Sequence, residues 1–242
     1  TPDTYPSLRG RAFWILGLMS AIKGDARRAV RFYESSLASL RDADERSNAA
    51  FVEMLIAAQL DLLGDVDGAW RARIGALPYT ERESAIQSVA LASSEAGWHM
   101  AASAVYKIVT TMAGDQRRDI VTVEAMRGAA RSLALAGRFE EGAPQLRDAR
   151  QIAARHPEPE WDLLRAELDL AEAECVVHSA PAAATEAATR AMSFFAATKR
   201  EVRDPEVRLA RARAYLAAGQ HAQAEVDLVA GIDSMDRVRR RL

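Results

Sequence analysis

The sequence predicts an all-α protein built as an α-solenoid of about six helical hairpins, and three observations support this prediction. Ala is the most frequent residue, with 50 copies among 242 residues, and the other abundant residues (Leu, Arg and Glu) also favour helices. Only 6% of the residues are aromatic, so many close helix contacts are expected in place of one bulky core. A small residue ends an apolar stretch every 33 to 42 residues, at Gly24, Gly64, Gly97, Gly137, Ser179 and Gly219.

Each predicted hairpin closes at one of these small residues, because Gly adopts the left-handed backbone conformation without steric cost. A second small residue follows five positions later and lets the second helix approach the first closely. These second residues are Ala29, Ala69, Ala102, Gly142, Ala184 and Ala224. One hairpin cannot cover its own apolar face, so successive hairpins are expected to stack. The predicted hairpins span residues 7–41, 47–78, 81–113, 119–156, 159–199 and 204–238, within one repeat domain covering residues 1–242.

The first hairpin resembles the tetratricopeptide repeat, and weaker matches follow along the chain. Its large, Leu-Gly, turn, small and aromatic positions are occupied by Phe13, Leu16, Gly17, Gly24, Asp25, Ala29, Phe32, Tyr33 and Leu37. The third hairpin keeps Gly97, Ala102 and Tyr106, and the last keeps Tyr215, Gly219 and Ala224. The resemblance implies a right-handed superhelix whose concave face is lined by the first helix of each hairpin. Most intervals exceed the family's period of about 34 residues, which leaves the superhelical pitch open.

Patterns of catalytic or metal-binding residues are absent from the sequence. No two histidines stand at a metal-binding or catalytic spacing, and all four are expected to be solvated near turns or links: His99, His156, His178 and His221. Cys175, the one cysteine, excludes a disulfide scaffold and is expected to be a small buried residue rather than a nucleophile. The acidic pairs Glu140/Glu141 and Glu172/Glu174 are expected on exposed helix faces. We therefore expect no enzyme activity in this chain, no metal and no cofactor.

The charge balance and hydropathy also limit the expected partners. The net charge of −2 gives no reason to expect bulk binding of nucleic acid. The basic stretch at Arg237, Arg239, Arg240 and Arg241 is expected to complement a helix dipole instead. No run of about 18 apolar residues predicts a membrane span, and the first residues lack the pattern of a signal peptide, so a cytoplasmic location is expected. The absent initiator Met suggests a fragment of a longer protein.

The tetratricopeptide resemblance also implies a set of groove residues. The candidates are Trp14, Phe51, Met54, Asp61, Gln87, Arg127, Arg131 and Arg213. Trp14, Phe51 and Met54 would form an apolar patch, and an exposed apolar end near Trp14 would allow self-association. Arg127 and Arg131, one helical turn apart, could grip a carboxylate bidentately. In the alternative interpretation, Trp14 caps the core and the two arginines pair with neighbouring acids.

The expected function is non-catalytic binding of a protein or peptide by a scaffold that recruits or regulates an attached effector domain. The chaperone-tail clamp of some family members needs two Asn residues, and this chain has only Asn48. The last hairpin and the Ala/Arg-rich composition resemble the repeats that precede the caspase-like peptidase domain of bacterial CHAT proteins. One alternative is a ligand- or signal-peptide-sensing module of a bacterial transcription regulator. Another is an enzyme, which would need a pocket with two titratable groups of perturbed pKa.

Overall fold

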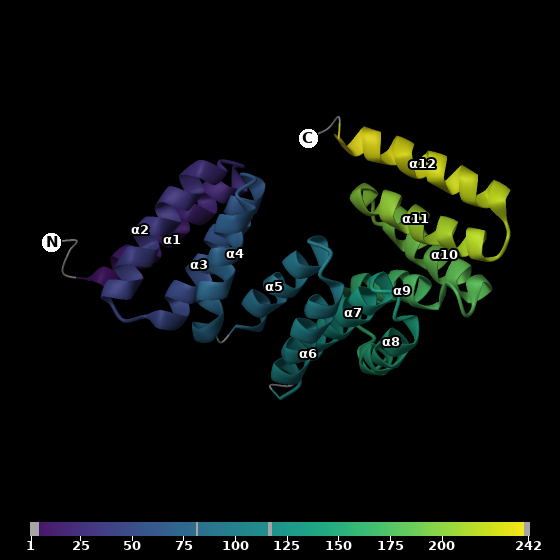
Figure 1. The fold of residues 1–242 in the computed structure, drawn as a ribbon, viewed down its shortest axis with the longest axis horizontal. Coiled ribbons are helices and arrows are strands. Elements are labelled where there is room, and N and C mark those ends of the chain that lie inside the picture. Colours follow the sequence, from purple (N-terminus) through teal and green to yellow (C-terminus); the bar gives the residue numbers. More distant parts are fainter. Residues whose placement is uncertain (1–4, 81, 116–117, 240–242) are drawn as a thin grey trace. The chain divides into compact units, whose positions relative to one another are not determined.

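The computed structural model describes residues 5–80, 82–115 and 118–239, which form twelve α-helices and three short 3-10 helices. Successive helices pack in hairpins, so the predicted all-α repeat fold is confirmed (Figure 1). The first elements are α1 (Pro6–Ile22), α2 (Ala26–Asp42), α3 (Arg46–Leu62), α4 (Val66–Ala76), η2 (Leu77–Tyr79), α5 (Glu83–Glu95) and α6 (His99–Asp115). They are followed by α7 (Asp119–Leu135), α8 (Phe139–Ala153), η3 (Pro159–Trp161), α9 (Asp162–Val176), α10 (Pro181–Ala197), η4 (Glu201–Arg203), α11 (Asp204–Ala217) and α12 (His221–Arg239).

The chain forms two compact units. Unit 1 comprises residues 1–89 and unit 2 comprises residues 90–242, with the division inside α5. A single repeat domain over residues 1–242, divided into the six predicted hairpin ranges, stays a prediction. Residue 81 of the third predicted hairpin, and Arg240 and Arg241 of the basic stretch, lie outside the described residues.

No helix in the described ranges combines the length and the apolar character that crossing a bilayer requires.

Glycine ends five of the hairpins' first helices, as the sequence predicts. Gly24, Gly64, Gly97, Gly137 and Gly219 all have φ between 73° and 81°. The residue after each donates its N–H to a carbonyl five residues earlier, as from Gln220 to Tyr215 at 2.8 Å, which closes the helix end. Ser179 does not adopt this conformation, and the α10 helix that follows begins at Pro181. Asp44 and Lys199, between hairpins, adopt it without being glycine.

Close approach of small residues accounts for the packing within both units. All six predicted small residues, from Ala29 to Ala224, are buried. In unit 1, Tyr33 of α2 lies over Gly17 of α1, where an added Cβ would be 2.4 Å from the ring. In unit 2, Tyr106 of α6 lies over Gly128 of α7 in the same way. In both units a glycine on one helix thus makes room for a tyrosine on an adjacent helix.

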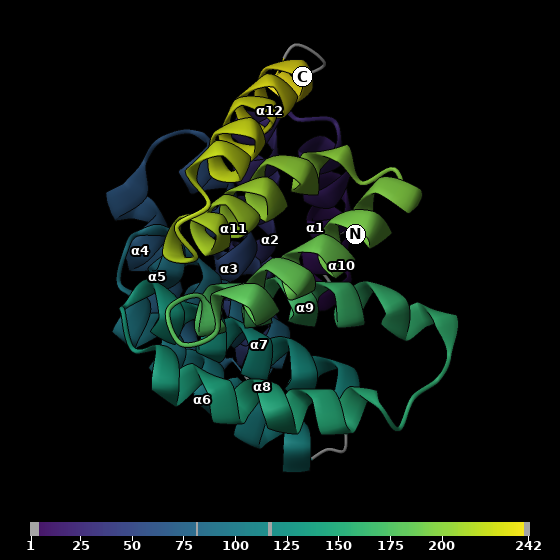
Figure 2. The same ribbon diagram turned by 90° about the vertical axis from the view of Figure 1, so that its right-hand side faces the viewer.

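Unit 2 is held together by two buried clusters that share α9. One joins α7 and α8 to α9 through Leu146, Leu168 and Cys175, and the other joins α9 to α10 and α11 through Leu170 and Phe195. Figure 2 shows α8 to α12 one above another. The first helices of successive hairpins also contact one another: α7 packs against α9, and α9 packs against α11. Their adjacent faces form a groove.

Candidate functional site

The groove of unit 2 consists of two adjoining cavities that meet at Leu135. We call the first the apolar cavity; it has a volume of about 580 Å³ and is lined by Ala134, Leu135, Phe139, Ala173, Glu174, Val177, His178, Ala210, Arg213, Leu216 and Ala217. We call the second the charged cavity; it has a volume of about 620 Å³, and its lining includes Arg127, Arg131, Glu167, Arg203 and Glu206. Both volumes lie in the range of roughly 300–1,000 Å³ typical of ligand pockets.

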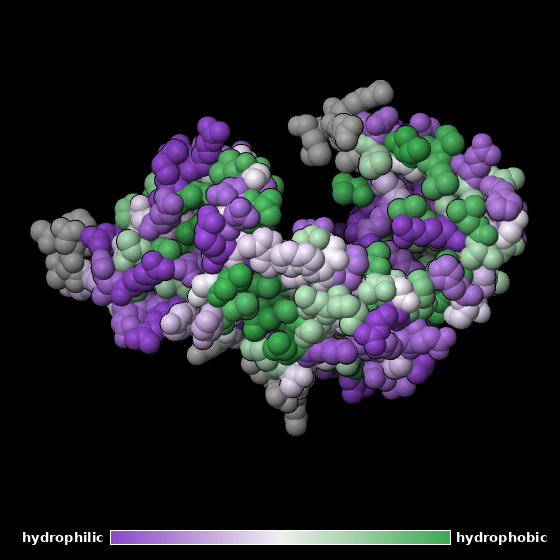
Figure 3. All heavy atoms as spheres, in the orientation of Figure 1, coloured by the Kyte–Doolittle hydropathy of each residue, from purple (hydrophilic) through white to green (hydrophobic). Residues whose placement is uncertain are grey.

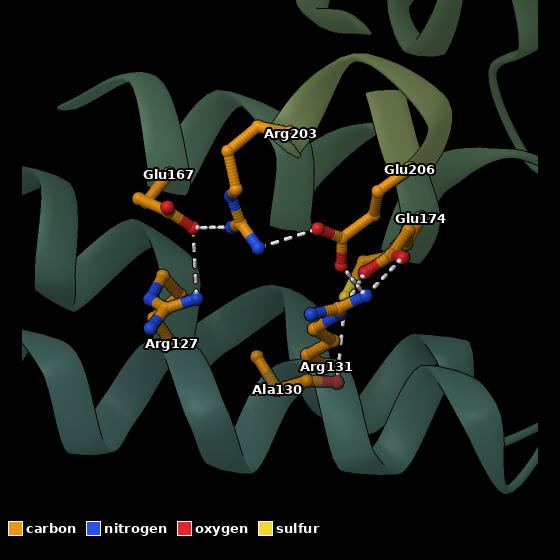
Figure 4. Close-up of polar contacts among 8 residues, drawn as sticks. Arg127, Ala130, Arg131, Glu167, Glu174, Arg203 and Glu206 are labelled. Atoms are coloured by element: carbon orange, nitrogen blue, oxygen red, sulfur yellow. Dashed lines mark hydrogen bonds and ion pairs between the residues drawn. The ribbon is translucent and has the colours of Figure 1, made fainter. Parts of the chain in front are cut away.

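Six alternating charges join α7, α9, η4 and the start of α11 (Figure 4). Five of them line the charged cavity, and the sixth, Glu174, lines the apolar cavity. Arg131 on α7 donates two parallel hydrogen bonds to Glu174 on α9, from Nε at 2.7 Å and from Nη2 at 3.1 Å. It also donates to Glu206 on α11. Arg127, one turn earlier on α7, donates from Nη1 to Glu167 of α9 at 3.1 Å. Arg203 completes the set by donating to both Glu167 and Glu206.

Burial controls the electrostatics of the Arg131–Glu174 pair. The Glu174 side chain is only 8% exposed, and this burial raises the pKa of its carboxyl, while the charge of Arg131 opposes the shift. Burial alone would lower the pKa of Arg131, but Glu174 and Glu206 outweigh it and hold that pKa above its ordinary value. A guanidinium cannot lose its proton in a protein, and structural ion pairs commonly perturb pKa values. The pair therefore gives no support to the enzyme hypothesis.

Arg213 is the exposed cation of the groove. It lies on α11, lines the apolar cavity, and makes no hydrogen bond or ion pair with the rest of the described chain. Its charge lowers the pKa of Glu174 slightly against the effect of burial. The apolar cavity therefore combines a mostly aliphatic wall with one available guanidinium. This arrangement suits an apolar side chain that lies next to a carboxylate.

Three of the eight predicted groove residues thus lie together in unit 2. Arg127, Arg131 and Arg213 line the two cavities. Arg131 does grip a carboxylate bidentately, but the carboxylate belongs to Glu174 of the same chain. The alternative interpretation, in which neighbouring acids pair with the two arginines, describes the structure better. The acids come from the next two hairpins: Glu167 and Glu174 lie on α9 and Glu206 on α11.

The other five predicted residues belong to unit 1. Trp14 packs against the buried cluster, with its ring centroid 5.2 Å from that of Phe51. The groove assignment of Met54 is wrong, because its side chain is 6% exposed and packs inside the core. Asp61 pairs with the buried Arg73 of α4. Gln87 is half-buried on α5.

Sequence reasoning missed the acids that pair with the groove arginines. Glu174 was expected on an exposed helix face, and that prediction is wrong for it. The sequence contained one indication that Glu174 is buried, namely that it directly precedes Cys175, which was expected to be buried. In the structure α9 is covered on two sides, so few of its positions face solvent. Glu167, one heptad earlier, lies on the same side of α9 and is also mostly buried, with 15% of its side chain exposed.

The four histidines do not all behave as solvated residues. His221 and His178 are exposed, although His178 also contacts the edge of Phe139. The prediction is wrong for His156, which stacks on Trp161 at 4.1 Å and shares a hydrogen bond of 2.8 Å with Asp119. His99 is partly buried at the start of α6. Across the parts of the chain that the structure describes, no group of three His, Cys, Asp or Glu side chains is placed to hold a metal ion.

Cys175 is buried, as predicted, and we expect its thiol to react slowly in the native protein. Its side chain packs against α7 with Sγ 3.5 Å from the carbonyl oxygen of Ala130, and burial raises the pKa of the thiol to about 12. Only a very small fraction is a thiolate at pH 8. We expect the native protein to react with a chromogenic disulfide reagent far more slowly than the urea-unfolded protein. Equal rates in the two states would contradict the buried placement.

Comparison with known proteins identifies the fold but no family. No family model matches this chain, and no curated protein matches it. Among solved structures, the apo form of RapI superposes with a TM-score of 0.79 at 11% identity, covering 97% of this chain. BtubC (BKLC) from P. vanneervenii superposes with a TM-score of 0.62 at 13% identity, covering 89% of this chain and 90% of BtubC. The fold is that of tetratricopeptide-type helical solenoids.

The match to RapI is partial in length and low in sequence identity. This chain spans 66% of the length of the RapI chain. At 11% and 13% identity the two likenesses describe the shared fold alone.

Proposed function

We propose that this chain is a non-catalytic scaffold that binds a peptide segment of a partner protein in the groove of unit 2. Solenoids of this fold present the first helices of successive hairpins as a binding surface, and here α7, α9 and α11 supply both cavities. The observation that carries the proposal is the available guanidinium of Arg213 at an apolar cavity of about 580 Å³. The peptide feature that fits is a bulky apolar side chain beside a carboxylate.

The scaffold would recruit or regulate an attached effector domain. Support for this part comes from the sequence resemblance to the repeats that precede a CHAT peptidase domain. The likenesses to solved structures add nothing to it, because they concern the fold. We further propose that the scaffold acts in the cytoplasm of a bacterium, which rests on the same resemblance.

The groove is tested by selecting ligands from a random peptide display library on the immobilised protein. We expect enriched sequences to combine an apolar side chain with an Asp, a Glu or a free C-terminus. Arg213→Glu is expected to weaken the best peptide about tenfold or more, since a charge-assisted hydrogen bond contributes roughly 1.5–3 kcal/mol. Fluorescence anisotropy with the labelled peptide measures the change.

The matched control is Arg147→Glu, which reverses an exposed charge on α8 outside the lining of both groove cavities. It should leave peptide affinity unchanged. Arg127 and Arg131 are unsuitable for this test, because both make ion pairs that hold unit 2 together. Equal affinity for wild type and Arg213→Glu, or enrichment of peptides without an acidic group, would overturn the assignment of the groove.

A further inference from the structure

Most of the charges that line the groove are already paired with one another. Of the eight Arg and Glu side chains that line its two cavities, three of each sign form the network of Figure 4: Arg127, Arg131, Arg203, Glu167, Glu174 and Glu206. The charges of these six cancel. The remaining two are Arg213 in the apolar cavity and Glu95 in the charged cavity. A ligand in the groove therefore meets one positive and one negative charge that no neighbour neutralises.

Glu95 is the exposed acid of the charged cavity. It is the last residue of α5, it belongs to unit 2, and it makes no hydrogen bond or ion pair with another residue that the structure describes. The C-terminal end of a helix carries a partial negative charge, which disfavours a carboxylate at that position. A cation bound beside Glu95 would therefore be attracted both by the carboxylate and by the helix end.

The hydroxyl group of Tyr106 is a second acceptor in the same cavity. Tyr106 of α6 lines the charged cavity and is 7% exposed, and its hydroxyl group has no hydrogen-bond partner among the described residues. Burial raises the pKa of Tyr106, and the charge of Glu95 adds to this effect, so the hydroxyl group is neutral at pH 7. A neutral phenol oxygen can accept a hydrogen bond from an ammonium or guanidinium group.

Exposed leucines line both cavities and the place where they meet. Leu91 lies in the charged cavity, Leu135 in both cavities and Leu216 in the apolar cavity, and they are 51%, 41% and 46% exposed. In Figure 3, hydrophobic residues (green) and hydrophilic residues (purple) lie side by side where unit 2 is hollowed. Apolar parts of a ligand can pack on these leucines, and so can the methylene stem of a Lys or Arg side chain.

We propose that the charged cavity binds a basic group of the peptide, with Glu95 as its ion-pair partner and the Tyr106 hydroxyl group beside it. This proposal rests on the groove as the peptide site and adds the second charge of its ligand. The bound segment then places an acidic group at Arg213, an apolar side chain at Leu135 and a basic group at Glu95. The basic group is a Lys or Arg side chain or a free N-terminus, all of which present charged N–H donors. Opposite charges at the two cavities also determine the direction in which the segment lies.

The test compares matched peptides on wild type and on Glu95→Gln by fluorescence anisotropy. The best peptide from the display library is expected to contain Lys, Arg or a required free N-terminus in addition to its acidic group. Glu95→Gln removes the charge and keeps the shape, and it should weaken this peptide about fivefold. When the basic side chain of the peptide is replaced by Gln, the same variant should change the affinity less than about twofold, because the interaction is then absent. N-acetylation of the peptide distinguishes the two sources, since it weakens binding only where the N-terminus is the basic group.

The matched control is Glu225→Gln, which makes the same change at an exposed glutamate of α12 outside the lining of both cavities. It should leave the affinity unchanged. Enriched peptides without a basic group overturn the proposal, and so does an equal effect of Glu95→Gln on both peptides, which indicates a structural role for Glu95. If Arg213→Glu weakens the peptide and Glu95→Gln does not, the groove remains the peptide site and only the basic subsite is excluded. If neither variant changes the affinity, or if the library yields no peptide, both proposals are wrong.

Discussion

Replacing Arg131 with Met is expected to lower the free energy of unfolding by about 3 kcal/mol, because it leaves a buried carboxylate without its partner. Glu174, 8% exposed, would lose both hydrogen bonds from Arg131, and Glu206 would lose one. Urea denaturation followed by circular dichroism measures the loss as a lower midpoint at unchanged slope. In the Arg131→Met background, Glu174→Leu should recover most of the loss, since no buried charge is then left unpaired.

The pH dependence of this loss follows from the pKa of Glu174. Burial raises that pKa in the native protein, and removing Arg131 removes the main opposing charge. A carboxyl whose native pKa exceeds its unfolded value destabilises the fold above the native pKa, and the penalty shrinks as the pH falls toward the unfolded value. The difference between Arg131→Met and wild type should therefore be smaller at mildly acidic pH than at pH 7.

Arg138→Met is the control for the effect of losing an arginine. Arg138 pairs with Glu141 at the surface, and both side chains are nearly half exposed. Exposed pairs contribute about 0–1 kcal/mol, so little change is expected. If Arg131→Met costs no more than Arg138→Met, the charged cavity does not stabilise unit 2.

Gly128→Ala is expected to destabilise the protein by about 2 kcal/mol through overpacking. The new Cβ would be 2.5 Å from the ring of Tyr106, which is 7% exposed and cannot move aside without disturbing the core. Ala favours helix over Gly by about 1 kcal/mol, and this gain offsets only part of the strain. Thermal denaturation followed by circular dichroism measures the net effect.

Gly114→Ala makes the same chemical change on α6, where an added Cβ has no neighbour within 4 Å. The variant should be neutral or slightly stabilised. In the Gly128→Ala background, Tyr106→Leu should reduce the strain by shortening the opposing side chain. If Gly128→Ala and Gly114→Ala are equally stable, the packing of Tyr106 does not require a glycine at position 128.

The hairpins were predictable because local rules determine them. Each turn glycine needs a left-handed conformation that few other residues adopt, and each alanine five residues later lies at a close contact. These constraints act within one hairpin and appear directly in the sequence. Asp44 and Lys199 were not recognisable as left-handed positions, since neither is a glycine.

The groove was predictable only in part, because it depends on contacts across hairpins. The family register placed Arg127, Arg131 and Arg213 on the lining helices. It could not show that Glu174 and Glu206, 43 and 75 residues after Arg131, would reach the same guanidinium. Met54 was misassigned because the register gave its helix but not the direction of its side chain, which points into the core.

The bond from Arg131 to Glu206 has a consequence for cooperativity. In a simple repeat array each hairpin contacts only its neighbours, and unfolding follows a one-dimensional chain of nearest-neighbour couplings. Arg131 lies on the fourth hairpin and Glu206 on the sixth, so this interaction reaches past the fifth. If the sixth hairpin unfolds by itself, it loses an ion pair with the fourth hairpin as well as its contacts with the fifth. This coupling therefore favours unfolding of hairpins four to six together. Because side chains that line the groove carry this coupling, we expect α7, α9 and α11 to unfold together in one cooperative transition.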